Sequence, residues 1–280
     1  MKKIAISLAI AVLVFSSCDD FYSSSMGSSR AYDWEKIDIT ISNVSDWFQA
    51  TVGNPPLAEA VMKAINHRLN TVTNPYERAI FLEYASKLAM EASGLGTSIL
   101  LTATDLLGVF SSDADPEDLV DNVISIFDKL QWDFITRGGA AAAANLAGLV
   151  SNGLVPGTNQ PGNTPKFDPN YINRVQSSDV AEAVIVLVLG EMSNNGHFDI
   201  DNLDELENLG LDLTNDIPPL VKVMDNAYPS EEAIAIAAYL NLIAEHPEKF
   251  DDNPITNAIY DTLINQSGNA NEAETQGEDE

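Results

Sequence analysis

Hydrophobic side chains recur every three or four positions along most of the chain, which is the spacing of an amphipathic helix. One such stripe consists of Tyr76, Ile80, Tyr84 and Leu88. On another face of the same segment, Glu83, Lys87 and Glu91 stand four residues apart, as ion pairs along a helix do. The pattern predicts an all-α protein.

Several helix starts are marked by a polar residue that is followed by proline, at Asn54-Pro55, Asn74-Pro75 and Asp115-Pro116. The polar side chain caps the first turn, and proline is tolerated next because its missing N–H would have no partner there. Ser93-Gly94 marks a helix end. Gly94-Leu95-Gly96-Thr97 lacks the preceding strand and third glycine of a nucleotide-binding loop, so we interpret it as a helix end followed by a cap.

Two segments are apolar enough to be buried helices. Residues 138–150 are mostly alanine and glycine, whose small side chains let a neighbour approach closely, so we expect a central packing helix there. Residues 184–189, VIVLVL, have the composition of a strand, but their flanks are helical and we expect a fully buried helix. Asp179 and Glu182 have the spacing of a capping box at its start.

Further helices are expected near 201–210, 216–227, 230–246 and 254–266. With the preceding segments they predict an irregular multi-helix bundle of about ten helices. No repeat of fixed period is present, so a regular repeat solenoid is not expected.

The segment 151–171 is rich in proline and glycine and has no hydrophobic period, which is typical of a linker. The helices therefore form either one bundle or two lobes that meet at this segment. The predicted organisation is a signal peptide over 1–17, a flexible tether over 18–32, an N-terminal helical lobe over 33–152, a linker over 153–171, a C-terminal helical lobe over 172–266 and a disordered acidic tail over 267–280.

The N-terminus has the three parts of a secretory signal peptide: Lys2 and Lys3, an apolar run from Ile4 to Phe15, and small residues before Cys18. The run is too short to cross a bilayer, which takes about 20 residues. Phe15-Ser16-Ser17-Cys18 resembles the lipobox of bacterial lipoproteins, and phenylalanine in place of the usual leucine resembles the looser lipoboxes of spirochaetes. The resemblance implies cleavage before Cys18, a lipid on its thiol, and export to the bacterial cell envelope.

Cys18 is the only cysteine, so no intrachain disulfide can form. A core cysteine is not expected beside Asp19 and Asp20, and no neighbouring base would activate a reactive thiol. Two or three acyl chains would anchor the protein stably, whereas one would not. In enteric bacteria an aspartate after the lipidated cysteine implies retention in the inner membrane, and Asp19 matches, but the rule differs among bacteria, so the inner or outer membrane and the leaflet stay open.

The chain is strongly acidic, with a formal net charge of −28 and a sequence pI of about 4.1. Such a chain is repelled by phosphate groups, so nucleic acid is not expected as a partner. The acidic residues are scattered along the chain, which indicates a solvated surface; attraction to a cationic partner is the alternative.

The histidines do not stand in the spacing of a known catalytic or metal-binding motif. His67, His197 and His246 lie far apart, and the spacings of zinc and serine-hydrolase motifs are missing. We therefore expect no enzyme, no zinc site and no cofactor.

Residues 191–202 carry part of the pattern of a helix–loop–helix calcium site. The candidate ligands are Glu191, Ser193, Asn195, His197 and Asp199, with glycine at the sixth position. The twelfth position is asparagine in place of the bidentate glutamate, so we favour a polar turn between two helices.

Residues 109–130, VFSSDADPEDLVDNVISIFDKL, resemble a segment of helical lipoproteins that are associated with periplasmic TRAP-type transporters. In that family the segment lies closer to the lipidated end, and no binding residue can be transferred. The resemblance implies an alternative function, that of a transporter-associated component that binds a ligand or a partner.

These features predict a membrane-anchored, non-enzymatic envelope lipoprotein that presents a helical interaction or scaffold surface, with an envelope protein as its partner. A scaffold should carry an apolar or aromatic surface patch, whereas a ligand-binding component should carry an enclosed pocket. Trp34, Trp47 and Trp132 are candidates for either, and core packing is the simpler interpretation.

Overall fold

The structure is a computed structural model. It describes residues 32–95, 134, 139–195, 211–213, 221–224, 230–257, 259, 260 and 263. The signal peptide, Cys18, Trp132, the segment 109–130, the helix expected at 201–210 and the acidic tail lie outside the described residues.

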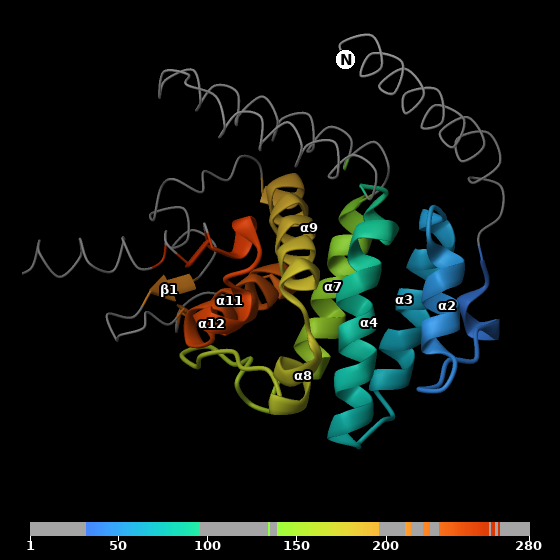
Figure 1. The fold of residues 1–280 in the computed structure, drawn as a ribbon, viewed down its shortest axis with the longest axis horizontal. Helices are drawn as coiled ribbons and strands as arrows, with labels where there is room; N and C mark the ends of the chain where they lie inside the picture. Colours follow the sequence, from blue (N-terminus) through green and yellow to red (C-terminus); the bar gives the residue numbers. More distant parts are fainter. Residues whose placement is uncertain are drawn as a thin grey trace, which may run out of the picture.

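Helices dominate the described residues and pack around one hydrophobic cluster, so the all-α prediction is confirmed (Figure 1). In chain order the elements are η2 (Trp34–Lys36), α2 (Val44–Thr51), α3 (Pro55–Leu69), α4 (Pro75–Ser93), α7 (Gly139–Gly153), α8 (Pro169–Arg174), α9 (Ser177–Asn195), β1 (Leu211–Leu213), β2 (Val221–Val223), α11 (Glu231–Glu245) and α12 (Pro247–Phe250).

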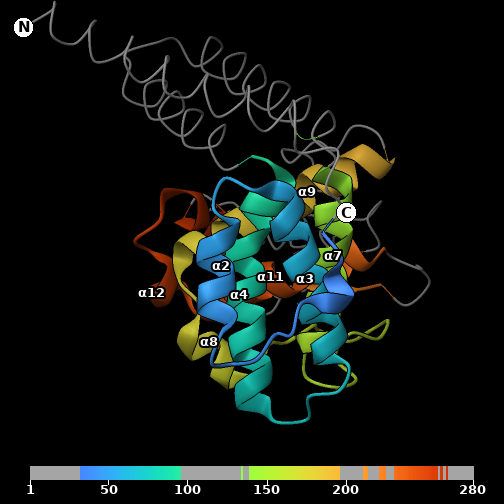
Figure 2. The ribbon, with the colours of Figure 1, turned by 90° about the vertical axis from the view of Figure 1, so that its right-hand side faces the viewer.

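Helices α4 and α7 form the middle of the bundle. Figure 1 shows α3 and α2 on one side of α4 and α9 and α11 on the other, and Figure 2 views the bundle from the side of α2. Helix α7 contacts α3, α4, α9 and α11, and its Leu146, Ala147 and Val150 are fully buried. The predicted central packing helix at 138–150 is therefore confirmed.

Helix caps lie where the asparagine–proline pairs predict them. Asn54 Oδ1 accepts from the Leu57 backbone N–H at 3.4 Å, and Asn74 Oδ1 accepts from the Tyr76 N–H at 2.9 Å. Helix α4 ends at Ser93, and Gly94 follows with a φ of 72°, a left-handed conformation that glycine adopts without strain.

Helix α9 confirms that residues 184–189 are a buried helix, but it begins at Ser177. The predicted capping box at Asp179 and Glu182 is therefore wrong, because Asp179 already lies inside the first turn. Its carboxylate interacts with the backbone amide of Gln176. That is one of the two contacts of a capping box, the one that the third helical residue makes with the residue before the helix.

The helix predicted at 216–227 is also wrong. Within that range Val221–Val223 form β2, which pairs antiparallel with β1 in the register Leu211↔Val223 and Leu213↔Val221. Val221 and Val223 are buried while Lys222 between them is half-buried, which is the two-residue period of a strand.

The outer edge of β2 is bonded to a helix and a loop. The Asn241 side chain of α11 accepts from the Val221 N–H and donates to the Val221 carbonyl. The Val223 carbonyl accepts from the Gly162 N–H at 2.7 Å. Helix α11 itself confirms the helix expected at 230–246, and the described residues of 254–263 are helical as expected.

The loop between α7 and α8 is held by its own backbone. Leu154 bridges Phe167, and the Val155 N–H donates to the Lys166 carbonyl at 2.9 Å. Helices from both sides of this loop share one hydrophobic cluster, and α7 contacts both α9 and α11. The boundaries drawn at 153–171 stay a prediction.

No helix in the described part of the chain combines the length and the apolar character that crossing a bilayer requires.

Helices α7 and α9 approach so closely that position 190 has no room for a side chain. A Cβ on Gly190 would stand 2.3 Å from the Ala143 Cβ, and no side-chain rotation relieves a contact between two β-carbons. We expect Gly190→Ala to destabilise the protein by about 1–3 kcal/mol in urea unfolding, although alanine ordinarily stabilises a helix interior by ~1 kcal/mol over glycine.

Gly148→Ala is the matched control, because a Cβ there meets only the ends of the Glu231 and Asn66 side chains, at 3.3 and 3.4 Å. It should cost nothing, and adding Ala143→Gly to Gly190→Ala should restore stability. Equal losses in the two single glycine variants would contradict the close approach.

Candidate functional site

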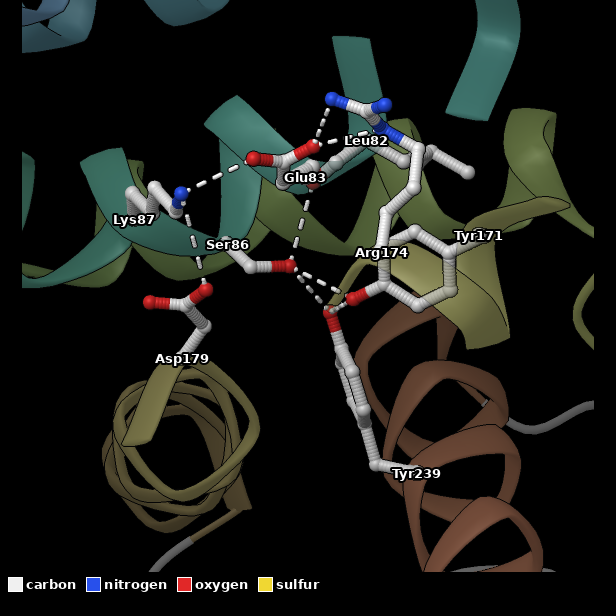
Figure 3. Close-up of polar contacts among 8 residues, drawn as sticks. All are labelled: Leu82, Glu83, Ser86, Lys87, Tyr171, Arg174, Asp179 and Tyr239. Atoms are coloured by element: carbon white, nitrogen blue, oxygen red, sulfur yellow. Dashed lines mark hydrogen bonds and ion pairs between the residues drawn. The ribbon is translucent and has the colours of Figure 1, made fainter. Parts of the chain in front are cut away.

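A buried polar cluster lies where α4, α8, α9 and α11 meet (Figure 3). At its centre Ser86 Oγ lies 2.8 Å from the Tyr171 hydroxyl and 2.9 Å from the Tyr239 hydroxyl, and the two phenol oxygens are 3.2 Å apart. The exposed fractions of Ser86, Tyr171 and Tyr239 are 1%, 0% and 1%. We refer to these three residues as the hydroxyl trio.

The hydroxyl trio has three protons for four contacts. Ser86 Oγ also lies 3.1 Å from the Leu82 carbonyl oxygen, which can only accept. We therefore assign the serine proton to Leu82 and both tyrosine protons to Ser86 Oγ, whose two lone pairs accept them. The remaining contact, between Tyr171 and Tyr239, is then the one without a proton, which agrees with its being the longest of the four.

No member of the hydroxyl trio is placed to activate the serine. Burial raises the pKa of Tyr171 well above its ordinary value and that of Tyr239 to about 12, so both phenols stay protonated near neutral pH. A nucleophilic serine needs a base within hydrogen-bond reach, whereas here the neighbouring hydroxyls donate to Ser86. The trio therefore joins α4, α8 and α11 and does not provide a nucleophile.

Phe167 covers the hydroxyl trio from the side of the α7–α8 loop. Its ring centroid lies 4.6 Å from that of Tyr171 and 5.0 Å from that of Tyr239, and the side chain is buried. Aromatic pairs at these separations attract each other beyond their burial. The loop thus packs directly on the polar cluster.

An ion cluster lies beside the trio on α4. Glu83 Oε2 accepts from Arg174 Nε at 2.7 Å and lies 2.6 Å from Arg174 Nη2, while Glu83 Oε1 accepts from Lys87 Nζ at 2.9 Å. The Glu83–Lys87 step of the predicted ladder is therefore confirmed. The third member, Glu91, accepts instead from the Gly53 backbone N–H at 2.9 Å.

Lys87 also reaches α9, where its Nζ lies 3.9 Å from Asp179 Oδ2 (Figure 3). Burial raises the pKa of Asp179, against the opposing effects of the Lys87 charge and the Gln176 amide. Burial and the negative charges of Asp179 and Glu91 raise the pKa of Glu182 to about 7. Burial alone would lower the pKa of Lys87, but its hydrogen bond with Glu83 and the Asp179 charge raise it.

An open depression of about 390 Å³ lies between the start of α9 and α12. It is lined by Val175, Gln176, Ser177, Ser178, Lys249, Asp252 and Asn253. The lining is largely polar and includes both charge signs, and none of it belongs to the buried polar cluster. It lacks the apolar lining typical of a ligand pocket.

The first three calcium candidates, Glu191, Ser193 and Asn195, lie in the last turns of α9. Glu191 Oε2 accepts from Ser230 Oγ at 2.7 Å, and Ser193 Oγ donates to the Leu189 carbonyl at 2.7 Å. Residues two apart on a helix point to different sides, so Glu191 and Ser193 do not face a common centre.

The remaining calcium candidates, His197 and Asp199, lie outside the described residues, so the calcium hypothesis stays a prediction. Within the described ranges, no three His, Cys, Asp or Glu residues are grouped to hold a metal ion.

The two described tryptophans pack against the protein. Trp34 is half-buried, with its ring centroid 5.5 Å from that of His67, and half-buried Trp47 packs against the hydrophobic cluster. The placement of Trp47 agrees with the simpler interpretation, core packing, whereas Trp34 contacts His67 and is not part of the hydrophobic cluster.

The hydroxyl trio was not predicted from the sequence, although one signal was available. Asp168-Pro169 repeats the cap–proline pattern, and Asp168 Oδ1 accepts from the Asn170 N–H at 2.8 Å to start α8, the helix that carries Tyr171. No sequence signal pairs Ser86 with Tyr239, because 153 positions separate them.

Comparisons of the chain with protein-family models, with curated proteins and with solved structures found no match.

The proton assignment in the hydroxyl trio predicts the order of three substitutions. Ser86→Ala removes the acceptor of both tyrosine protons and should cost about 1–3 kcal/mol of unfolding free energy, because a buried donor is left without a partner. Tyr171→Phe and Tyr239→Phe each remove one hydrogen bond and should cost about 0.5–1.5 kcal/mol. Chemical denaturation measures all three, and a larger loss in either phenylalanine variant than in Ser86→Ala would overturn the assignment.

Proposed function

We propose that the protein is a lipoprotein of the bacterial cell envelope, anchored by a lipid on Cys18, which presents its helical domain as an interaction surface. The observation that carries the proposal is the N-terminal arrangement of Lys2-Lys3, the apolar run from Ile4 to Phe15, and the lone cysteine directly after two serines.

An anchor on Cys18 would limit how far the domain can lie from the membrane. The described residues begin at Tyr32, 14 positions after Cys18. A chain of that length spans at most about 50 Å, so an anchored domain stays within that distance of the lipid. In this proposal the domain works close to the membrane surface.

The chemistry of the domain suits a presenting role. The hydroxyl trio, and Glu83 with Arg174 and Lys87, form hydrogen bonds and ion pairs within the domain. These groups hold helices together and are not free to bind a partner. What the domain offers to a partner is its surface, and the acidity of the chain favours a partner with a cationic face.

The alternative function, a component of a transporter, is distinguished by its partner. Crosslinking in native membranes followed by affinity purification of the full chain should recover an envelope protein. Recovery of a transporter subunit would favour the alternative, and recovery of no partner would count against both roles.

The anchor is tested by Cys18→Ala. Because the thiol is the expected site of lipid attachment, the variant should appear in the soluble fraction and lose metabolic labelling by a fatty-acid analogue. Phe15→Leu is the control and should keep both properties, since leucine is the usual lipobox residue. Undiminished labelling of Cys18→Ala would exclude the anchor.

A further inference from the structure

The depression at the start of α9 contains hydrogen-bond donors that have no partner in the described part of the protein. Its lining comes from the start of α9 and the two residues before it, and from α12 and the residues after it: Val175, Gln176, Ser177, Ser178, Lys249, Asp252 and Asn253. The first backbone bond of α9 runs from the Val180 N–H to the Gln176 carbonyl at 3.1 Å. The N–H groups of Ser177 and Ser178 come before this bond, and no described acceptor pairs with them.

Ser177 is a buried polar residue of this lining, with an exposed fraction of 7%. Its hydroxyl has no hydrogen-bond partner among the described residues, although buried hydroxyl groups usually have one. The hydroxyl oxygen keeps some contact with solvent. Because the rest of the residue is covered and the residue lines the depression, that contact is made through the depression. A ligand bound there can accept the hydroxyl proton.

Lys249 of α12 brings a positive charge to the same depression. Its side chain is half-buried and forms no ion pair with a described carboxylate. Four other lysines of the described chain each lie beside a carboxylate: Lys36, Lys63, Lys87 and Lys166. Asn253 adds a further donor. Its Oδ1 already accepts from the Ile255 and Thr256 N–H groups, at 2.9 and 3.4 Å, which leaves its Nδ2 group for a ligand.

Two carboxylates oppose an anion at this place. Asp252 is exposed and is the one acidic side chain of the lining. Asp179 lies in the first turn of α9, but its carboxylate interacts with the Gln176 amide and lies 3.9 Å from Lys87 Nζ of α4. It therefore leaves the first N–H groups of the helix unused. With the Lys249 charge offsetting that of Asp252, the unpartnered donors give the depression its character.

We propose that this depression binds a phosphate group, which accepts from the N–H groups of Ser177 and Ser178, from the Ser177 hydroxyl and from the Lys249 ammonium group. The N-terminus of a helix attracts anions, because its free N–H groups carry about half a positive charge. Phosphate offers more acceptor oxygens than a carboxylate does, so it suits a site with this many donors. The polar depression of about 390 Å³ has the volume of a small-molecule site. The site does not involve Cys18, so it and the anchor fail separately.

The acidity of the whole chain disfavours phosphate, so saturable binding has to come from local donors. The test is a titration of the full chain with inorganic phosphate, followed by NMR of the backbone amide groups. The Ser177 and Ser178 signals should shift and saturate, whereas sodium chloride at equal ionic strength should leave them unchanged. The absence of a saturable shift at these amides, or equal shifts with chloride, would overturn the proposal. This measurement needs no variant.

The phosphate group can come from two sources, a soluble phosphate ester and a phospholipid headgroup, and vesicles of phosphatidylglycerol distinguish them. The vesicles are mixed with the Cys18→Ala full chain, so that a lipid on Cys18 cannot hold the protein. Sedimentation with the vesicles that inorganic phosphate reverses would assign the site to a headgroup. Failure to sediment, with the amide shifts retained, would assign it to a soluble ester. Without the amide shifts the proposal fails, whatever the vesicles do.

Substitutions test the individual side chains in calorimetric titrations with inorganic phosphate. Lys249→Gln and Ser177→Ala should each weaken binding about tenfold, since each removes a hydrogen bond to a charged group. Asp252→Asn should tighten binding, because it removes a repelling charge. Arg68→Gln is the matched control: it makes the same charge change on an exposed cation in the last turn of α3, and it should leave the affinity unchanged. Equal affinities of Arg68→Gln and Lys249→Gln would show that only net charge matters and would overturn the proposal.

Discussion

A helix that is packed on several sides has to satisfy its polar groups inside the protein, and α4 is such a helix. It contacts α2, α3, α7, α8 and α9, yet it carries Ser86 and Glu83 among its buried residues. Ser86 is satisfied by tyrosines from α8 and α11, and Glu83 by Arg174 at the end of α8. These bonds fix where α8 and α11 lie, so the polar groups of one helix set the positions of its neighbours.

The contact between α7 and α9 depends on small side chains instead of hydrogen bonds. Helix α7 is built mostly from alanine and glycine, and α9 meets it at Gly190, where only a hydrogen atom fits against Ala143. Directional bonds thus join α4 to α8 and α11, whereas close backbone approach joins α7 to α9. The first specifies which helices meet, and the second sets how near they come.

Features decided by neighbours in the chain could be predicted, and features decided by distant residues could not. The caps at Asn54 and Asn74 and the helix end at Gly94 are local, and each was foreseen. Residues 221–223 form a strand where the sequence predicts a helix, because the partners of this strand come from β1, from Gly162 and from Asn241, none of them a neighbour in the chain. The hydroxyl trio escaped prediction for the same reason, and the predicted capping box at Asp179 was wrong because the helix already begins at Ser177.

The contact between Asn241 and Val221 also bears on association between copies of the chain. A carboxamide presents an N–H donor and a C=O acceptor side by side, as the edge of one residue in a strand does, so Asn241 presents to Val221 what a residue of another strand would present. With Val223 bonded to Gly162, the outer residues of β2 already have partners on the side away from β1. Unpaired strand edges are the templates on which chains add to one another and aggregate. Here a helix side chain and a loop occupy that edge, and a second molecule approaching β2 would find no free row of backbone groups to extend.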